Sequence, residues 1–368
     1  MLQISFWKNR RVLVTGHTGF KGSWLVLWLL SLGAEVWGLS LDSESEESLL
    51  KSFDLSGQQV GNLPGKLNHF VGDIRDFLTC KKLIDASRPQ VVIHLAAQAL
   101  VRRSYIDPLE TWSTNVQGSL NILEALKSLS EPCAVVMITT DKVYQNNEWD
   151  YGYRESDRLG GSDPYSASKA AAELAISSWR SSFCGTAQHQ NPHLAIASAR
   201  AGNVIGGGDW AVDRLIPDTI RALSANQVVR VRNRLATRPW QHVLEPLGGY
   251  LLLAERLSFD PIFFAQAYNF GPHIESNKTV EEMVNNMLRI WPGKWSEFFS
   301  DSEPREASKL HLQIDKSSNH LGWKPVWNFD VTVEKTVNWY YKSHKGDSAL
   351  SCCLSDLNAY HESLSHAY

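Results

Sequence analysis

The sequence lacks the features that define several other protein classes. Its five cysteines, at positions 80, 133, 184, 352 and 353, are odd in number and form no CxxC pair, which argues against a disulfide framework and a zinc ribbon. The longest apolar run, Trp24 to Leu30, has seven residues and is far shorter than the ~20 needed to cross a bilayer. The N-terminal segment has no long apolar stretch followed by a small-residue cleavage site, so we expect a protein of the reduced cytoplasm.

An excess of charge of one sign is also missing. The chain has 36 Lys and Arg against 39 Asp and Glu, a formal net charge of -3, which gives no general attraction to nucleic acid or to an anionic membrane. The twelve histidines form no HExxH motif, and no metal site is predicted. With 368 residues, 43% of them apolar, the chain is long enough for one large domain or two interlocked domains.

What the first 200 residues do contain is an alternation of short apolar segments and helical segments. Near-continuous apolar strands separated by helices are typical of a parallel sheet covered on both faces, so the fold class is α/β, a Rossmann-type doubly wound parallel sheet. The predicted strands are 11–16, 35–41, 68–73, 91–97, 133–140 and 194–200, and the predicted helices are 22–32, 76–87, 111–129 and one that starts at Pro164 after Asp163 as its N-cap.

After residue 200 the alternation loosens, and helices are predicted at 245–257, 279–290 and 329–343. We therefore expect 1–200 to form the sheet domain, with 237–258 returning to it. Residues 201–236 and 259–345 would form a smaller mixed α/β lobe that binds the substrate, and the polar 346–368 would be a weakly ordered tail.

A glycine turn follows the first predicted strand directly. Residues 16–22 read GHTGFKG, a GxxGxxG pattern between a strand and a helix. Glycines there permit a tight turn and a close approach of pyrophosphate to the helix N-terminus, which predicts dinucleotide binding. The cofactor contacts expected here are Gly16, Thr18, Gly19, Phe20, Lys21 and Gly22.

The ends of the next strands supply the remaining cofactor candidates. Ser40 or Asp42 can reach the adenosine ribose, and no Lys or Arg stands nearby in the sequence to favour a 2′-phosphate, so NAD is expected rather than NADP. Asp42 can equally be a solvated charge in the acidic run 42–47, and Asp73 either accepts from the adenine amino group or is a turn residue. Ile74, Leu95, Ala96 and Ala97 complete the expected lining.

The catalytic candidates begin with Tyr165 and Lys169, a YxxxK pair. On a helix these positions share a face, and a nearby ammonium lowers the pKa of a phenol, which makes a base for a sugar hydroxyl. Thr140 ends the fifth predicted strand, where ligands of such sheets bind, and its hydroxyl can hold the substrate oxygen. Asp141 and Lys142 follow it directly.

Five motifs occur in the order seen in extended short-chain dehydrogenase/reductases that act on nucleotide sugars: the glycine turn, HLAA (94–97), TTDKVY (139–144), YxxxK and RAGNVIG (200–206). The similarity covers roughly residues 10 to 340. Within this superfamily GHTGFKGSWL (16–25), RRSYIDP (102–108) and the Asp-Lys pair resemble the CDP-D-glucose 4,6-dehydratases. In related dTDP-glucose dehydratases the pair is Asp-Glu, and in 4-epimerases these positions are typically small and non-acidic, so Lys142 departs from both.

The resemblance implies a substrate, CDP-D-glucose, and a role for each catalytic candidate. Tyr165 takes the C4 hydroxyl proton while C4 gives hydride to NAD; the ketone acidifies the C5 hydrogen, water is lost, and hydride returns to C6. Asp141, protonated, would donate to the departing C6 oxygen. Lys142 would be the C5 base if burial or cations lower its pKa from ~10.4, or would remain charged and hold the enolate.

The same resemblance assigns residues to the sugar and the diphosphate. Asn203 matches a residue that binds pyrophosphate or hexose, and guanidinium groups of the second half match phosphate oxygens. Gln98 and Arg103 should face the cleft, whereas His17 and His94 are expected to be structural. The full set of substrate candidates is Gln98, Arg103, Asn203, Arg214, Arg232 and Arg238.

The resemblance implies a hydro-lyase with tightly bound NAD that feeds dideoxysugar and surface-polysaccharide (O-antigen) synthesis. The alternatives are another nucleotide-sugar dehydratase or epimerase, or a non-catalytic NAD(H)-sensing protein on the same fold. A homodimer or homotetramer, paired through helices equivalent to 109–129 and 164–183, is expected from the superfamily.

Overall fold

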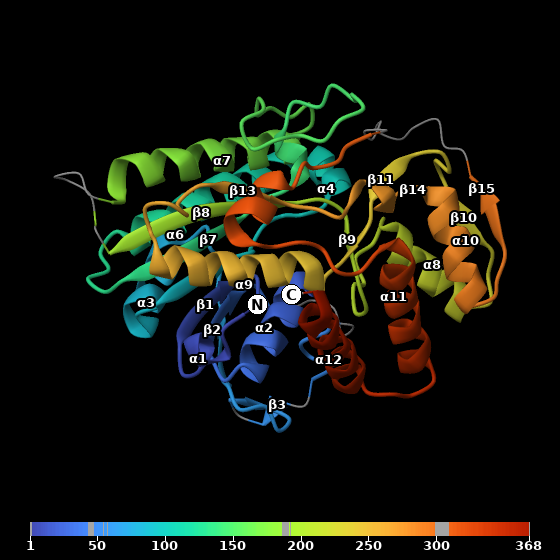
Figure 1. The fold of residues 1–368 in the computed structure, drawn as a ribbon, viewed down its shortest axis with the longest axis horizontal. Helices are drawn as coiled ribbons and strands as arrows, with labels where there is room; N and C mark the ends of the chain where they lie inside the picture. Colours follow the sequence, from blue (N-terminus) through green and yellow to red (C-terminus); the bar gives the residue numbers. More distant parts are fainter. Residues whose placement is uncertain are drawn as a thin grey trace.

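Seven parallel strands form the central sheet of the computed structural model, which describes residues 2–42, 48–53, 55–56, 58–185, 191, 193–298 and 309–367 (Figure 1). Their order is β13-β8-β7-β6-β1-β2-β5, and every neighbouring pair is parallel. The predicted doubly wound sheet is therefore confirmed. The strands are β1 (Arg11–Thr15), β2 (Glu35–Ser40), β5 (Lys66–Val71), β6 (Val91–His94), β7 (Cys133–Ile138), β8 (Leu194–Ala201) and β13 (Ala267–Phe270).

Helices cover both faces of this sheet because its inner strands are apolar on both sides; every residue of β7 and β8 is buried. One face carries α3 (Phe77–Ser87), α6 (Ser119–Leu126) and α7 (Pro164–Phe183), and the other carries α2 (Phe20–Ser31) and α9 (Leu244–Phe259). The short helices α1 (Ile4–Trp7), α4 (Val101–Ile106) and α5 (Pro108–Trp112), and the hairpin of β3 (Leu55–Ser56) and β4 (Gln59–Val60), lie at the margins.

Two helices that position the site show why they begin where they do. Asp163 caps α7 by accepting a hydrogen bond from the Ser166 amide at 2.9 Å, and Pro164 occupies the first helical position, as predicted. The long helix expected over 111–129 runs from α5 to α6 through a π-helical segment, η1 (Ser113–Gly118). Such π segments place side chains that a regular helix would direct elsewhere.

The second lobe is built on small sheets at the carboxyl ends of the main strands. It contains α8 (Leu215–Ser224) and α10 (Val280–Ile290), the parallel pair β10 (Val229–Val231) with β15 (Trp295–Glu297), and the antiparallel pair β11 (Thr237–Pro239) with β14 (Asn277–Thr279). Two further strands, β9 (Val204–Ile205) and β12 (Gln241–His242), pair where the lobe joins the sheet. Short helical turns η2 (Asp141–Val143), η3 (Ile274–Ser276) and η4 (Ser317–Leu321) complete the connections.

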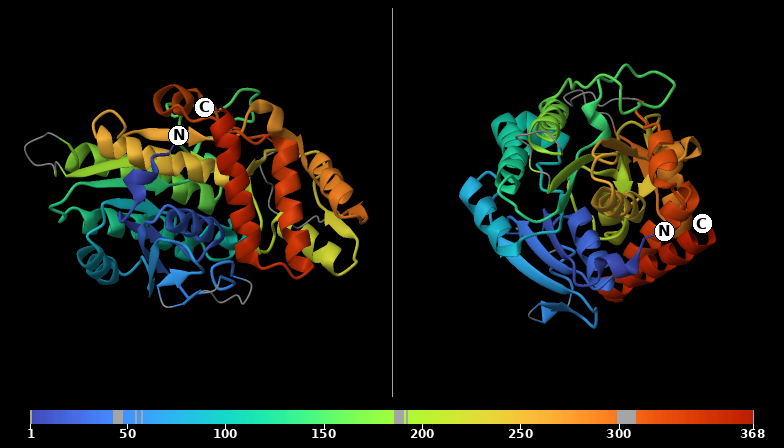
Figure 2. Two further views of the ribbon diagram at one scale, coloured as in Figure 1. Left: turned by 60° about the horizontal axis from the view of Figure 1, so that its bottom comes forward. Right: turned by 60° about the vertical axis from the view of Figure 1, so that its left-hand side comes forward.

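Two expectations about the second half need correction. Residues 259–345 do not lie wholly in the lobe, because β13 is the seventh strand of the main sheet, with Tyr268 and Phe270 fully buried. The tail is not weakly ordered: α12 (Ala349–Ala367) packs beside α11 (Phe329–His344), as Figure 2 shows, and buries Cys352, Cys353 and Tyr360. Its apolar residues recur at helical spacing, a pattern that the polar composition of the tail obscured.

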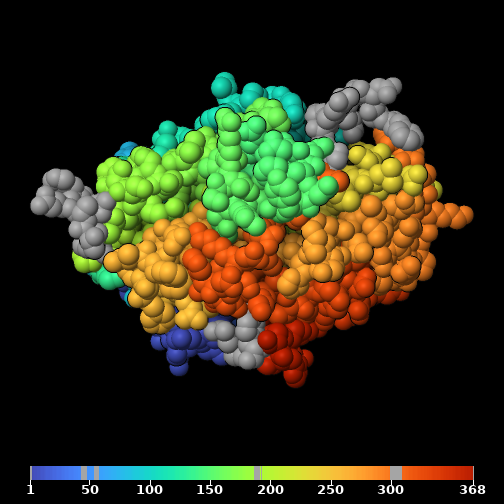
Figure 3. Space-filling model, turned by 45° about the horizontal axis from the view of Figure 1, so that its top comes forward, coloured from blue at the N-terminus to red at the C-terminus, as the bar shows by residue number. Residues whose placement is uncertain are grey.

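The segment between η2 and α7, residues 144–163, lies on the surface of the molecule that faces the viewer in Figure 3. Tyr153 forms an isolated bridge with Leu312, and the two residues share an apolar cluster with Val143 and Tyr144. The chain that leaves the catalytic strand is therefore fixed against the segment that leads to η4.

Candidate active site

The glycine turn has the geometry that the spacing predicts. Gly16 has φ 74°, a left-handed conformation that favours glycine, and its amide donates to the Leu39 carbonyl at 2.7 Å. A Cβ on Gly22 would lie 2.1 Å from the Gly16 oxygen, so this position must be glycine for α2 to pack against the turn. A Cβ on Gly19, at the N-cap of α2, would meet only the Gly16 oxygen at 3.4 Å. The helix N-terminus is thus open to a pyrophosphate, and the residues present fit a dinucleotide.

A cleft of about 880 Å³ runs from this turn along the carboxyl ends of the strands to the second lobe. It brings together nearly all the residues that the sequence analysis selected. The selected residues that line it are Gly16, Thr18, Gly19, Phe20, Lys21, Gly22, Ser40, Asp42, Asp73, Ile74, Leu95, Ala96, Ala97, Arg103, Thr140, Asp141, Lys142, Tyr165, Lys169, Asn203, Arg214 and Arg238.

The two ribose candidates differ in what their side chains already contact. Ser40 is buried, its hydroxyl lies 2.9 Å from Nδ1 of His17, and it accepts from the Thr18 amide at 3.2 Å, so it supports the glycine turn. His17 is fully buried and also contacts His69, which is the structural role expected of it. Asp42 is exposed at the rim. Its carboxylate is therefore the better placed of the two to reach a ligand hydroxyl.

Asp73 already has a partner in the structure. Arg75, which the sequence analysis did not consider, donates to Asp73 from both Nε, at 2.8 Å, and Nη2, at 2.5 Å, and also lines the cleft. The hydrogen bonds from Arg75 lower the pKa of Asp73. The carboxylate therefore stays ionised as an acceptor at neutral pH. The sequence could have indicated this ion pair, because Arg75 lies only two residues after Asp73.

The catalytic candidates converge at the end of β7. The Thr140 hydroxyl donates to Oδ1 of Asp141 at 3.0 Å, and Thr140 acts to lower the pKa of the nearby Tyr165 phenol. Tyr165 and Lys169 share one face of α7, and the Lys169 ammonium donates to the Ile138 carbonyl at 3.4 Å. All four side chains are buried, whereas Lys142 is half-buried.

Burial is the largest influence on the pKa values of Asp141, Tyr165 and Lys169. It raises the pKa of Asp141, against the lowering effects of Lys142 and Thr140, which favours the protonated acid. It lowers the pKa of Lys169 to about 8, opposed by the charge of Glu173. The expectation that Lys169 lowers the pKa of Tyr165 is not met within the protein alone: burial, with the charge of Asp141, raises that pKa to about 12.

Lys21, which the sequence analysis assigned to the cofactor only, also interacts electrostatically with the catalytic candidates Asp141 and Lys169. Burial lowers its pKa to about 8, with Arg214 and Lys169 acting in the same direction and Asp141 opposing them. The lysine that we assigned to the cofactor turn is thus electrostatically coupled to the proposed acid, because the N-terminus of α2 and the end of β7 meet in one cleft.

Of the substrate candidates, four line the cleft and two do not. Gln98 does not face the cleft as expected: its amide donates to Leu100 O and the Thr111 hydroxyl at 3.0 and 2.9 Å, and its oxygen accepts from the Leu100 amide. Arg232 is not among the residues that line the cleft, and it donates to Asp213 at 3.0 Å. Both were misplaced because local partners, which a sequence does not reveal, fix their side chains.

The other candidates keep their place. Arg214 pairs with Asp209 at 2.9 Å, and Nη1 of Arg238 donates to the Thr237 carbonyl at 2.9 Å while its charge acts on Asp141. Arg103 pairs with Glu110 at 2.8 Å. His94, as expected, is structural: it is buried between Thr15 and Ser119.

Sequence reasoning missed Asn115 and Arg102. Asn115 lies in η1, is fully buried, and its amide donates to the Ser168 hydroxyl on α7 at 2.9 Å and to the Gln98 carbonyl at 3.1 Å. It therefore ties the cleft loop to the helix that carries Tyr165. Arg102 lines the cleft and pairs with Asp213 at 3.2 Å; its signal was the Arg-Arg doublet, of which only Arg103 was selected.

Within the described residues, no helix has the length and apolar character to cross a membrane, and no group of three or more His, Cys, Asp or Glu side chains is arranged to hold a metal ion.

Known proteins resemble this chain over most of its length. The chain is 45% identical to the CDP-glucose 4,6-dehydratase of Salmonella typhimurium (strain LT2) over 98% of each chain. It is 25% identical to the dTDP-D-glucose 4,6-dehydratase of Homo sapiens over 90% of each chain. Among solved structures, it matches dTDP-glucose 4,6-dehydratase from Bacillus anthracis in complex with NAD with a TM-score of 0.74 and 20% identity, covering 93% of this chain and 99% of that one.

The epimerase Mth375 of Methanothermobacter thermautotrophicus has the same fold, with a TM-score of 0.77 and 22% identity over 93% of this chain and 95% of its own. The family model described as GDP-mannose 4,6 dehydratase matches residues 13–336, which confirms the resemblance that the motifs indicated. On the strength of this match and of the 45% identical relative, the chain belongs to the GDP-mannose 4,6-dehydratase family.

Proposed function

We propose that the protein is a CDP-D-glucose 4,6-dehydratase that uses NAD and yields CDP-4-dehydro-6-deoxy-D-glucose. The observation that carries this proposal is the Asp141-Lys142 pair, which lines the same cleft as Thr140, Tyr165 and Lys169. A 4-epimerase needs no acid for a departing C6 oxygen, and a buried carboxyl with a raised pKa serves as such an acid. The 45% identical relative bears this activity in its name.

The residues that would hold NAD are the glycine turn, Asp42 and the strand-end residues Ile74, Leu95, Ala96 and Ala97, all of which line the cleft. Bound NAD would supply the hydride chemistry, as the acceptor of hydride from C4 of the sugar and its donor to C6. The N-terminus of α2 would face its pyrophosphate, as the open position at Gly19 permits.

Each catalytic side chain then has a proton to hold or move. Tyr165 takes the C4 hydroxyl proton, with Thr140 holding the same oxygen; the positive charges of Lys169 and of a bound nicotinamide would lower the phenol pKa that burial raises. Lys142 takes the C5 proton, or remains charged beside the enolate; the second role keeps its ammonium as a fixed donor. Asp141 gives its proton to the C6 oxygen as it leaves as water.

The sugar nucleotide would be held by the arginines of the cleft. Arg214 and Arg238 carry planar guanidinium groups suited to two phosphates, and Asn203 lies between them and the catalytic strand end in the sequence. We infer that the nucleotide base is cytosine only from the similarity to the 45% identical relative. We assign the protein to the reduced cytoplasm, which the free cysteines of the described chain support, and to deoxysugar synthesis for surface polysaccharide.

The test is incubation of the NAD-loaded protein with CDP-, dTDP-, UDP- and GDP-glucose. The expected result is loss of one water from CDP-glucose, seen by mass spectrometry, together with keto-sugar absorbance. An unchanged mass with an inverted C4 would instead identify an epimerase. Absence of turnover with all four sugars would support a non-catalytic NAD(H)-binding protein. Tyr165→Phe is the inactive control.

A further inference from the structure

The helix that carries Tyr165 and Lys169 also carries a buried carboxylate that does not line the cleft. Glu173 on α7 is 3% exposed. Its Oε1 accepts from the Thr139 hydroxyl at 2.5 Å, and its Oε2 accepts from the Ser198 hydroxyl at 2.9 Å and from Nη2 of Arg200 at 2.8 Å. One side chain thus joins α7, the end of β7 and β8.

The position of Glu173 links it to two catalytic groups. It follows Lys169 by four residues and Tyr165 by eight, so the three side chains share one face of α7. Its partner Thr139 immediately precedes Thr140, which lines the cleft together with Tyr165. Moving Glu173 would therefore change the spacing between the strand end and the helix where the two catalytic hydroxyls meet.

The charge of Glu173 also acts on Lys169. Burial lowers the pKa of Lys169, and the negative charge of Glu173 is the one opposing influence on it. Although burial disfavours its ionised form, Arg200 and the hydroxyls of Thr139 and Ser198 keep the pKa of Glu173 below its usual range. Lys21 on α2 and His94 on β6 interact electrostatically with Lys169. Arg180 on α7 and Arg200 on β8 interact with Glu173, and Tyr144, after η2, accepts from Arg200.

Stability alone gives little reason for this arrangement. A buried ion pair such as Glu173–Arg200, with both side chains at most 4% exposed, is often no more stabilising than apolar residues of the same volume. What it provides here is a fixed geometry, because both carboxylate oxygens and both terminal guanidinium nitrogens have partners.

We propose that Glu173 is a positioning residue for the dehydratase: it holds the Thr139–Thr140 strand end against α7 and keeps the ammonium of Lys169 charged. This inference rests on the proposed function for its kinetic consequences. Its electrostatic part, the effect of Glu173 on Lys169, stands without any turnover.

Two variants separate the two parts. Glu173→Gln keeps the volume and removes the charge, so kcat should fall about 10- to 100-fold and the alkaline limb of the kcat–pH profile should move to lower pH by about one unit, because an opposite charge near an ammonium raises its pKa by that order. KM should change less than about threefold, since Glu173 does not line the cleft. Thr139→Val removes one hydrogen bond and no charge, so it should lower kcat and leave the limb in place.

The control is Glu255→Gln. Glu255 on α9 is also a buried carboxylate, 2% exposed, and it accepts from Nε1 of Trp7 at 2.7 Å and from the Gln3 amide at 2.9 Å, away from the cleft. It should lower thermal stability without moving the pH profile. The proposal would be overturned if the alkaline limb of the kcat–pH profile lay at the same pH in wild type and Glu173→Gln. It would also be overturned if Glu255→Gln moved that limb as far as Glu173→Gln does.

A second readout is independent of activity. The pKa of Lys169 can be followed by NMR of protein labelled with ¹³C at lysine Cε, with Lys169→Met to assign the resonance. It should be lower in Glu173→Gln than in wild type, and Glu173→Asp should restore part of the difference. If Glu173→Gln does not fold, Glu173→Asp and Thr139→Val carry the test. Failure of the proposed function would show as no turnover in wild type with the Lys169 shift intact, whereas an unshifted Lys169 resonance overturns this inference.

Discussion

At the scale of single residues, the acid of the elimination step is the sharpest assignment. Asp141 is 3% exposed, and burial raises its pKa, so it holds a proton at a pH where a surface aspartate would have lost it. Asp141→Asn keeps the shape and removes the proton donor. We expect dehydration to fall by about 10²- to 10⁴-fold while exchange of the C5 hydrogen with solvent continues.

The measurement is mass spectrometry of CDP-glucose after incubation in D₂O, which reports water loss and deuterium uptake in one experiment. Asp85→Asn, on the outer face of α3, is the control and should behave as wild type. Dehydration at the wild-type rate in Asp141→Asn would remove the acid role from this residue.

Lys142 is the residue whose two possible roles the same experiment separates. If its amine is the C5 base, Lys142→Met should abolish deuterium uptake at C5 as well as water loss, with NAD binding retained. If its ammonium only stabilises the enolate, deuterium uptake should persist at a reduced rate. We expect loss of uptake, because Lys142 follows Asp141 directly in η2 and lines the cleft.

Part of this site could be predicted from the sequence because spacing alone places it. Tyr165 and Lys169 are one helical turn apart, and the glycine turn sits between a strand and a helix, so both follow from periodicity. Gln98 could not be placed, since whether an amide faces a cleft depends on partners such as Thr111 that only the folded loop provides. The raised pKa of Tyr165 depends on burial depth, which no spacing reveals.

At the scale of elements, the C-terminal helix differs most from expectation. Its tyrosine at position 360 packs edge-to-face on Trp28 of α2, with ring centroids 5.7 Å apart, and its hydroxyl donates to the buried carboxylate of Glu245 on α9. The α12 helix therefore covers the helix whose N-terminus forms the glycine turn. Composition suggested a loose tail because the polar residues of this segment outnumber the few that are buried.

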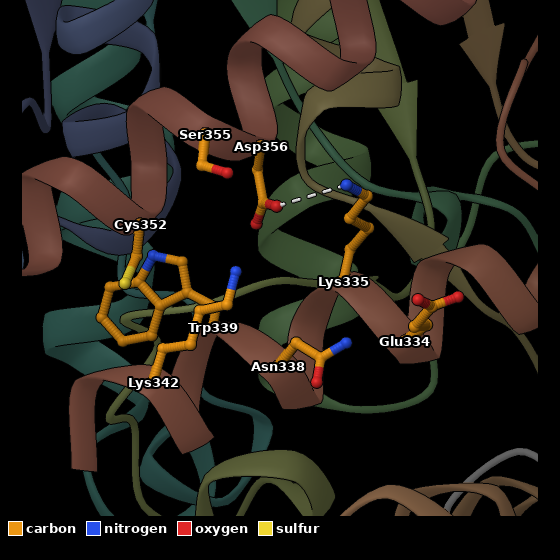
Figure 4. Close-up of a pocket in the computed structure, with 8 residues that line it drawn as sticks. All are labelled: Glu334, Lys335, Asn338, Trp339, Lys342, Cys352, Ser355 and Asp356. Carbon is orange, nitrogen blue, oxygen red and sulfur yellow. Dashed lines mark ion pairs between the residues drawn. The ribbon is translucent and has the colours of Figure 1, made fainter. Parts of the chain in front are cut away.

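Between α11 and α12 lies a small pocket that is lined by the carboxylate of Asp356, among other side chains (Figure 4). Asp356 is 7% exposed, its Oδ1 is 3.8 Å from Nζ of Lys335, and its Oδ2 has no hydrogen-bond partner among the described residues. Burial raises the pKa of Asp356 to about 7, opposed by Lys335 and Lys342. The fold thus binds a proton here that the unfolded chain, with an ordinary aspartate pKa, releases.

This difference makes stability depend on pH in a stated direction. Because the folded pKa is raised, the stability contributed by Asp356 is fully present below pH ~4 and is lost as the pH rises through about 7. Asp356→Asn cannot ionise, so at pH 8 it should increase the free energy of unfolding by about 1–3 kcal/mol, and at pH 4 it should match wild type. Thermal unfolding at the two pH values measures the difference, and equal melting temperatures at pH 8 would contradict it.

At the scale of the whole molecule, one apolar surface has the character of a subunit interface. Ile106 of α4, Leu109 of α5 and Leu174 of α7 are 84%, 81% and 63% exposed, and these three helices pack against one another. Of these helices, α5 and α7 overlap the ranges 109–129 and 164–183 through which we expect the superfamily to pair, and α4 precedes them. Large exposed apolar patches mark interaction sites, and we predict that these side chains belong to one.

Leu174→Glu should therefore lower the solution mass from that of a dimer or tetramer toward that of a smaller species in light scattering after size exclusion. The matched control is Ile262→Glu, which changes an apolar side chain that is 72% exposed in the loop after α9. It should leave the mass unchanged. A wild-type protein that is already monomeric would contradict the assigned interface.

The late position of β13 in the chain has a consequence for synthesis. The backbone of β8 has no partner strand on one side until Ala267–Phe270 has left the ribosome. The ring of Trp28 is covered later still, when Tyr360 emerges. A nascent polypeptide from which the other six strands of the central sheet have emerged thus exposes backbone N–H and C=O groups of β8 without hydrogen-bond partners. Ribosome-arrested chains ending before residue 267 should bind chaperones that arrested chains ending after the last helix no longer recruit.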